Sequence, residues 1–83
     1  MIKDMFVVHD TKSGVFGTPF YAENISVAIR SFRYAANDKN TEIGKYPTDF
    51  NLYHLGNYDD TTAKFQLQDS PIHLAIASSL LEG

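Results

Sequence analysis

Residues 14–56 read GVFGTPFYAENISVAIRSFRYAANDKNTEIGKYPTDFNLYHLG, and this stretch decides the fold. It holds, in order, a β-forming segment stopped by Pro19, a capped amphipathic segment and a second β-forming segment. Because proline has no backbone N–H, Pro19 either ends the pairing of its strand or confines that strand to a sheet edge. This order of elements predicts a compact α+β domain with a binding or regulatory role.

The main helix is predicted over residues 25–37. Asn24 precedes it as an N-cap, because the asparagine side chain can accept a backbone N–H from the first turn. Apolar residues then recur at helical spacing, and we expect their face to pack on a sheet. The apolar face comprises Ile25, Ala28, Ile29, Phe32 and Ala36, and the opposite, polar face comprises Ser26, Arg30, Arg33 and Asn37.

Two β-hairpins are predicted around this helix. The first spans residues 3–21, with a cluster of turn formers after His9. The second joins the alternating segment 50–55 to residues 64–68 through a turn-rich stretch. Residues 41–48 are expected to form an irregular connection. The predicted order is ββαββ, an antiparallel sheet with one amphipathic helix packed on it and a C-terminal tail.

The tail, residues 72–81, can be interpreted in two ways. Leu74, Ala77 and Leu81 are spaced as in a helix, whereas Ile72, Leu74 and Ile76 alternate as in a strand. Its alanine and leucine content favours the helix, and a short strand before a helix is the alternative.

Length and composition limit what the chain can be. Its 83 residues form a single domain, 1–83, with a small core. The absence of cysteine excludes disulfides, thiolate zinc sites and cysteine nucleophiles. No run approaches the roughly 20 apolar residues of a membrane span, so a soluble intracellular protein is expected. Edge strands, six Phe and five Tyr in so short a chain predict a homodimer.

Charge favours at most a local contact with nucleic acid. Seven Lys and Arg against ten Asp and Glu give a net charge of −3, which opposes general binding to phosphates. Arg30 and Arg33 lie one helical turn apart and could contact successive phosphates or the carboxylates of a partner. Lys12 and Lys45 are candidates to extend this patch. The alternative is a solvent-exposed face that uses arginine for solubility.

Aromatic side chains could stack on bases, but a small core needs most of them. Five aromatic side chains are candidates for stacking, and we expect at most two of them to be exposed. The five candidates are Phe16, Phe20, Tyr21, Tyr53 and Tyr58.

Metal binding and catalysis are not expected. His9, His54 and His73 are scattered over three elements, whereas zinc ligands usually include a close pair. Asp59 and Asp60 lack the loop of a calcium site and indicate a hairpin tip. No nucleophile–base pair is recognisable. The chain is therefore predicted to be a non-enzyme with no metal and no cofactor.

A pattern of residues runs through about four-fifths of the chain in one order. It begins with Gly14, Phe16, Pro19 and Phe20, continues with Asn24, Ala28, Arg30, Phe32, Asn37 and Asp38, and ends with Pro47, Asp49, Phe50, Leu52, Tyr53, Leu55, Gly56, Asp59 and Pro71. In this pattern the chain resembles the small nonstructural protein of gokushovirus-type microviruses, which are single-stranded DNA bacteriophages. One departure is Thr62-Ala63 in the second hairpin, where that family often has Thr-Gly.

The resemblance implies an accessory role in viral DNA replication, in the switch to single-stranded genome synthesis, and in packaging. The expected location is the host bacterial cytoplasm, with no membrane contact. Single-stranded DNA or proteins of replication and packaging are the expected partners. The alternative is an adaptor or inhibitor of host or viral replication proteins that does not contact nucleic acid.

Overall fold

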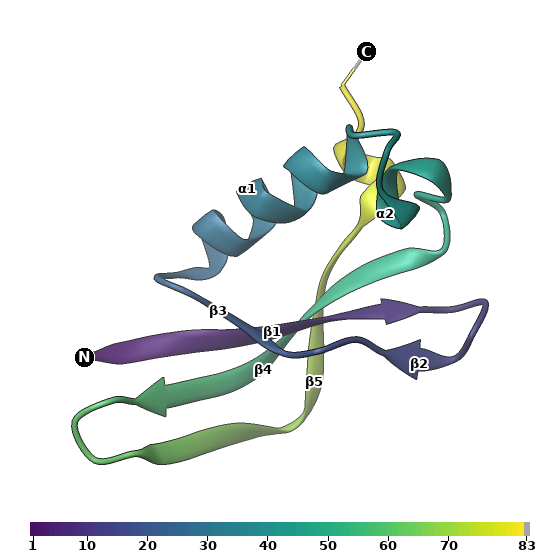
Figure 1. Cartoon of the computed structure of the whole chain (residues 1–83). Coiled ribbons are helices and arrows are strands. Elements are labelled where there is room, and N and C mark those ends of the chain that lie inside the picture. The colour runs from purple at the N-terminus through teal and green to yellow at the C-terminus, as the bar shows by residue number, and fades with distance from the viewer. Residues whose placement is uncertain (83) are drawn as a thin grey trace.

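The computed structural model describes residues 1–82 as an antiparallel sheet with one main helix across it (Figure 1). This architecture confirms the predicted α+β class. The strands are β1 (Ile2–Asp10), β2 (Val15–Phe16), β3 (Phe20–Ala22), β4 (Phe50–Asp59) and β5 (Lys64–Ile76), and the helical elements are α1 (Ile25–Ala36), α2 (Glu42–Lys45) and the 3-10 turn η1 (Ala77–Leu80).

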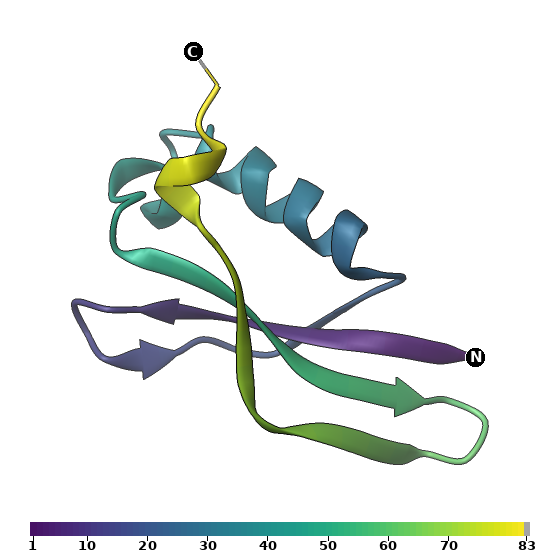
Figure 2. The same cartoon turned by 180° about the vertical axis from the view of Figure 1, so that it is seen from behind.

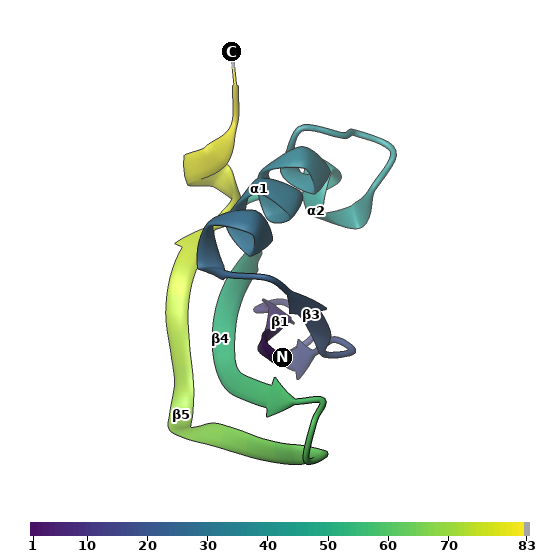
Figure 3. The ribbon, with the colours of Figure 1, turned by 90° about the vertical axis from the view of Figure 1, so that its left-hand side faces the viewer.

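Strand β1 organises the sheet, whose order is β2-β1-β4-β5 with β3 also paired to β1. Phe6 of β1 lies opposite Phe20 of β3 on one side and His54 of β4 on the other. The register of β4 shifts between His54 and Gly56 and again after Leu52. Such bulges increase strand twist. The resulting sheet is strongly curled, and the β4–β5 hairpin turns away from the helix (Figures 2 and 3).

Helix α1 is held by its cap and by its apolar face. The Asn24 Oδ1 accepts the Val27 N–H at 2.9 Å, which confirms the predicted N-cap. Phe32 is 3% exposed and belongs to one cluster with Phe6 and Leu52 of the central strands. Ile25 departs from the predicted face and is 39% exposed, since the buried cluster reaches only as far as Ala28 in the first turns of the helix.

The first hairpin forms as predicted, with Pro19 as its interruption. Strand β2 has only two residues, and pairing with β1 resumes in β3 after the proline. The turn before β2 contains Gly14 at φ 73°, and its N–H donates to the Asp10 carbonyl at 2.8 Å. Because this φ is in the left-handed region, glycine is the least strained residue there.

The connection predicted as irregular contains the short helix α2. Thr41 is its N-cap, and its Oγ1 accepts the Gly44 N–H at 2.9 Å. The same hydroxyl lies 2.8 Å from the carbonyl oxygens of Ala35 and Asp38, which close the end of α1. A Cβ at Gly44 would collide with the Asp38 carbonyl, so glycine allows this close approach.

The tail preference for a helix over residues 72–81 was wrong for its first half. Strand β5 continues to Ile76, and only the 3-10 turn η1 follows it. The strand prevails because β4 supplies partners for it: His73 lies opposite Tyr53, and Ala75 lies opposite Leu52. Leu74 then packs against the core.

Within residues 1–82, no helix has the length and apolar content that crossing a membrane requires.

Replacing Phe32 with Ala should lower the free energy of unfolding by roughly 3–5 kcal/mol, because a buried aromatic ring is removed without a replacement. The matched control on the same helix is Tyr34→Ala, whose side chain is 78% exposed. This control should change stability by no more than about 0.5 kcal/mol. Urea unfolding measures both, and equal losses would contradict the assignment of the buried face.

Replacing Ala63 with Gly should raise the free energy of unfolding by about 0.5–1 kcal/mol. Ala63 has φ 60° in the β4–β5 turn, and this conformation costs a residue with a Cβ about 1–2 kcal/mol. Part of the gain is offset by the greater flexibility of glycine in the unfolded chain. Gly14→Ala is the opposite control and should be destabilising, although its new Cβ meets nothing within 4 Å. A less stable Ala63→Gly variant would contradict this account of the turn.

Candidate functional site

The outer face of α1 carries two arginines and an exposed tyrosine. Arg30 and Arg33 are exposed, and Tyr34 beside them is 78% exposed. These three residues line a shallow hollow of about 560 Å³. A guanidinium group can donate two parallel hydrogen bonds to the oxygens of one phosphate, and an aromatic ring can stack on an unpaired base. The other residues that line the hollow are Asn37, Asp38 and Glu82.

Asn37 fastens the C-terminal segment to the end of α1. Its side-chain Nδ2 donates to the Arg33 carbonyl at 2.9 Å and to the Leu80 carbonyl at 3.1 Å. Its Oδ1 accepts the Glu82 N–H at 2.8 Å. The bond to the Glu82 N–H holds this residue beside the end of α1. Glu82 and Asp38 line the same hollow as the arginines, so the hollow contains carboxylates as well as cations.

The two lysines of the predicted patch do not line this hollow. Lys12 lies in the turn after β1, where its N–H donates to the Asp10 Oδ1 at 2.9 Å. It lines a different hollow, which also contains Glu42 and Asp49. Lys45 ends α2. The structure therefore groups Arg30 with Arg33 and leaves Lys12 and Lys45 outside the hollow.

The sheet face opposite the helix carries a row of rings from four strands. Phe16 of β2 lies 4.3 Å from His9 of β1 and 5.7 Å from Tyr53 of β4, measured between ring centroids. Tyr53 in turn lies 5.3 Å from His73 of β5. The His73 Nε2 is 2.8 Å from the Asn51 Oδ1. These contacts fix the order of the rings across the sheet.

A second row of rings crosses the other end of the same face. Tyr21 lies 5.9 Å from Tyr58, which lies 4.9 Å from Phe65. Phe20 belongs to the core instead, 5.7 Å from Phe6. Of the five aromatics considered for stacking, only Phe16 and Tyr21 are exposed, at 46% and 48%, which confirms the expected maximum of two.

His54 is a buried polar residue, 8% exposed, and both of its ring nitrogens have partners. Its Nε2 lies 3.2 Å from the Asp4 Oδ1, and its Nδ1 lies 3.1 Å from the Gln68 Nε2. A neutral ring with its hydrogen on Nε2 satisfies both contacts, so these side chains link β1, β4 and β5. Within residues 1–82, the histidines and carboxylates form no group of three that could hold a metal ion.

Sequence reasoning missed Tyr34 and Phe65. Tyr34 lies four residues after Arg30 and off the apolar face of the helix, so the spacing alone could have placed its ring beside Arg30 on the outer face. Phe65 was assigned to one face of a hairpin, but the sequence does not show that this face is uncovered. It is 55% exposed.

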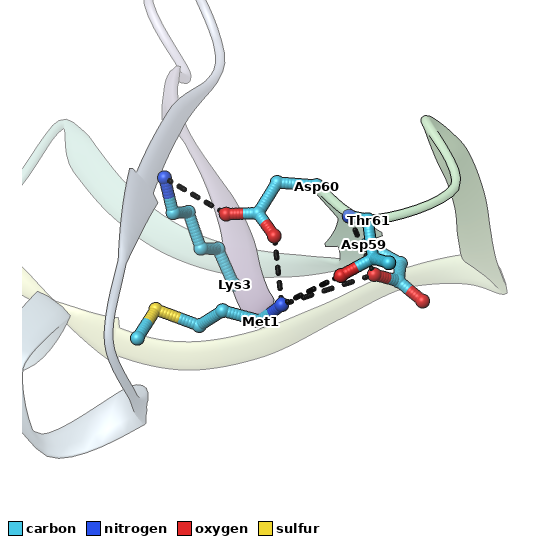
Figure 4. Close-up of polar contacts among 5 residues, drawn as sticks. All are labelled: Met1, Lys3, Asp59, Asp60 and Thr61. Carbon is cyan, nitrogen blue, oxygen red and sulfur yellow. Dashed lines mark hydrogen bonds and ion pairs between the residues drawn. The ribbon is translucent and has the colours of Figure 1, made fainter.

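The amino group of Met1 is held by the tip of the β4–β5 hairpin (Figure 4). It donates to the Asp60 Oδ1 at 2.7 Å and to the Thr61 Oγ1 at 3.2 Å, and the Lys3 Nζ lies 3.7 Å from the other Asp60 oxygen. The hydrogen bond with Asp60 raises the pKa of the amino group above its ordinary value and lowers the pKa of the Asp60 carboxyl.

Replacing Asp60 with Asn should return the pKa of the Met1 amino group toward its ordinary value of 8.0, because the carboxylate that favours the charged amine is lost. An NMR titration of the amino terminus measures this. Asp69→Asn, which removes a carboxylate elsewhere on the hairpin, is the control and should leave the pKa unchanged.

The ion pair between the Met1 amino group and the Asp60 carboxylate stabilises the fold only while both groups are charged. Its contribution is lost as pH rises through the raised pKa of the amine and as pH falls through the lowered pKa of Asp60. An unchanged amine pKa in the Asp60→Asn variant would contradict the contact.

One comparison with known proteins identifies a family, and this family is a phage one. Residues 3–80 match the family described as "Phage ORF5 protein". No curated protein and no solved structure matches the chain significantly. Since the match covers all of the main helix and nearly all of the sheet, the chain belongs to the Phage ORF5 protein family.

Proposed function

We propose that this protein is a non-enzymatic accessory factor of phage DNA replication that binds single-stranded DNA weakly through the outer face of α1. Its role is in the switch to single-stranded genome synthesis and in packaging, in the host bacterial cytoplasm. Membership of a phage family and the resemblance to the microvirus nonstructural protein support the process.

The observation that carries the proposal is the grouping of Arg30, Arg33 and the exposed ring of Tyr34 around one hollow. The arginines bind successive phosphates, and Tyr34 stacks on a base between them. Stacking of this kind contributes about 1–3 kcal/mol per base and does not depend on sequence. An accessory factor for a whole genome needs this lack of sequence preference.

Charge explains why the binding is weak. The chain carries a net charge of −3, and Asp38 and Glu82 line the same hollow as the arginines. Repulsion elsewhere on the surface keeps the contact local, so a strand does not wrap around the protein.

An adaptor that binds replication proteins without touching nucleic acid is the second candidate. The two rows of rings on the open sheet face favour it, because exposed aromatic side chains such as Phe16 and Tyr21 are enriched in protein interfaces. The acidic net charge is compatible with such partners.

Replacing Arg30 and Arg33 together with Ala should weaken binding to single-stranded DNA and reduce the salt slope of log K by about 2 at most. Both residues are exposed, so the melting temperature should stay nearly unchanged. Tyr34→Ala should also weaken binding but leave the salt slope unaltered, because it removes stacking and no phosphate contact. Fluorescence anisotropy with a labelled oligonucleotide across a salt series measures both effects.

The matched control is the double variant Lys12→Ala/Lys45→Ala, which removes the same charge outside the hollow. An equal loss in that control would assign binding to overall charge and not to α1. Undetectable binding by the unaltered protein at low salt would favour the adaptor.

A further inference from the structure

Strand β5 has an uncovered edge. It is the last strand in the sheet order, and within residues 1–82 no other strand pairs with its outer side. Residues 64–73 are all exposed, in contrast to the buried residues that alternate along β4. Figure 3 shows the first half of β5, drawn in green, turning below the rest of the sheet and away from α1. A long strand edge of this kind offers unpaired N–H and C=O groups to another strand.

The exposed part of β5 also carries apolar side chains. Phe65 is 55% exposed and Leu67 is 67% exposed. They lie opposite Tyr58 and Gly56 of β4, so both belong to the face that carries the rings. Soluble proteins usually protect such edges with charges, prolines or bulges. On β5 these protective residues are Lys64, Asp69 and Pro71, and residues 65–68 have none.

We infer that this edge pairs with β5 of a second copy of the chain, antiparallel and around a two-fold axis, so that two curled sheets become one. The inference is independent of DNA binding and assigns a surface to self-association. A two-fold contact is isologous, so the same residues from both copies meet at its centre.

The sequence of β5 selects the register. In a two-fold antiparallel pair, the numbers of opposite residues add up to an even constant, because opposite side chains share a face. With Gln66 at the centre, Phe65 lies opposite the partner's Leu67, and this apolar pair occurs twice. With Leu67 at the centre, Phe65 would instead face the partner's Asp69. Of these two registers, the one centred on Gln66 is the favourable one.

Local charge does not oppose a second copy at this edge. In the register centred on Gln66, Lys64 lies opposite the partner's Gln68, so no like charges meet. The acidic hairpin tip is partly neutralised, since Asp60 contacts the Met1 amino group and Lys3. Two copies with a net charge of −3 can therefore approach along β5 without placing their carboxylates in contact.

Analytical ultracentrifugation tests the proposal. The unaltered protein should change from a 9.3 kDa species at low micromolar concentration to twice that mass at high micromolar concentration. Leu67→Lys places a charge on the exposed edge and should raise the dissociation constant at least about tenfold. Val15→Lys is the matched control, because Val15 is 61% exposed on β2 at the opposite edge of the sheet. This control should dimerise like the unaltered protein.

A single cysteine tests the register. The chain has no cysteine of its own, so Gln66→Cys introduces one thiol at the predicted centre. Under mild oxidation this variant should form a disulfide-linked dimer much faster than Val15→Cys. Circular dichroism at low concentration confirms that each variant folds.

Three results would overturn the proposal. One is a 9.3 kDa species for the unaltered protein at every concentration. Another is a loss of dimer in Val15→Lys equal to that in Leu67→Lys, which would show that the contact is not specific to the β5 edge. The third is equal cross-linking of the two cysteine variants, which would indicate random collision.

Discussion

The packing of Phe32 against Phe6 and Leu52 is the contact on which the rest of the structure depends. Phe6 and Leu52 are fully buried and belong to the two central strands, so one side chain of α1 joins the helix to the middle of the sheet. Because the apolar side of the helix is fixed in this way, the side that carries Arg30 and Arg33 must face outward. The core thus determines which surface is available for binding.

The two proposed surfaces lie on different elements and can be occupied at the same time. The arginines are on α1, and the uncovered edge belongs to β5, the last strand of the sheet. A dimer paired through β5 would present two copies of the arginine face on one particle. Two weak sites linked rigidly bind one long strand more tightly than either does alone, provided that the strand can reach both.

The sequence was informative where a local rule decides the structure. Asn24 caps the helix through its own side chain, and Pro19 interrupts pairing because it lacks an N–H. It was less informative where distant residues decide. Residues 72–81 show both spacings and their composition favoured a helix, but β4 selects the strand for residues 72–76. Likewise, Lys12 and Lys45 were candidates to extend the arginine patch, but their positions depend on the whole fold and could not be read from the sequence.

The same limit applied to Tyr34 and to the edge of β5. Spacing shows that Tyr34 lies off the apolar face, but not that a hollow forms beside it. Alternation identifies Phe65 and Leu67 as one face of a strand, but their exposure follows from the absence of another strand beside β5 in the sheet.

The central position of β1 has a consequence for how the chain is synthesised. Its apolar residues Met5, Phe6 and Val7 are buried in the finished fold, yet the main partner strand, β4, lies about fifty residues downstream, as the Asp4–His54 contact spans 50 positions. The helix and the β4–β5 hairpin are local and can form early, whereas closing β1 onto β4 must wait for most of the chain. During that interval the edge of β1 that pairs with β4 in the finished fold stays uncovered on the nascent chain, open to chaperones or to aggregation.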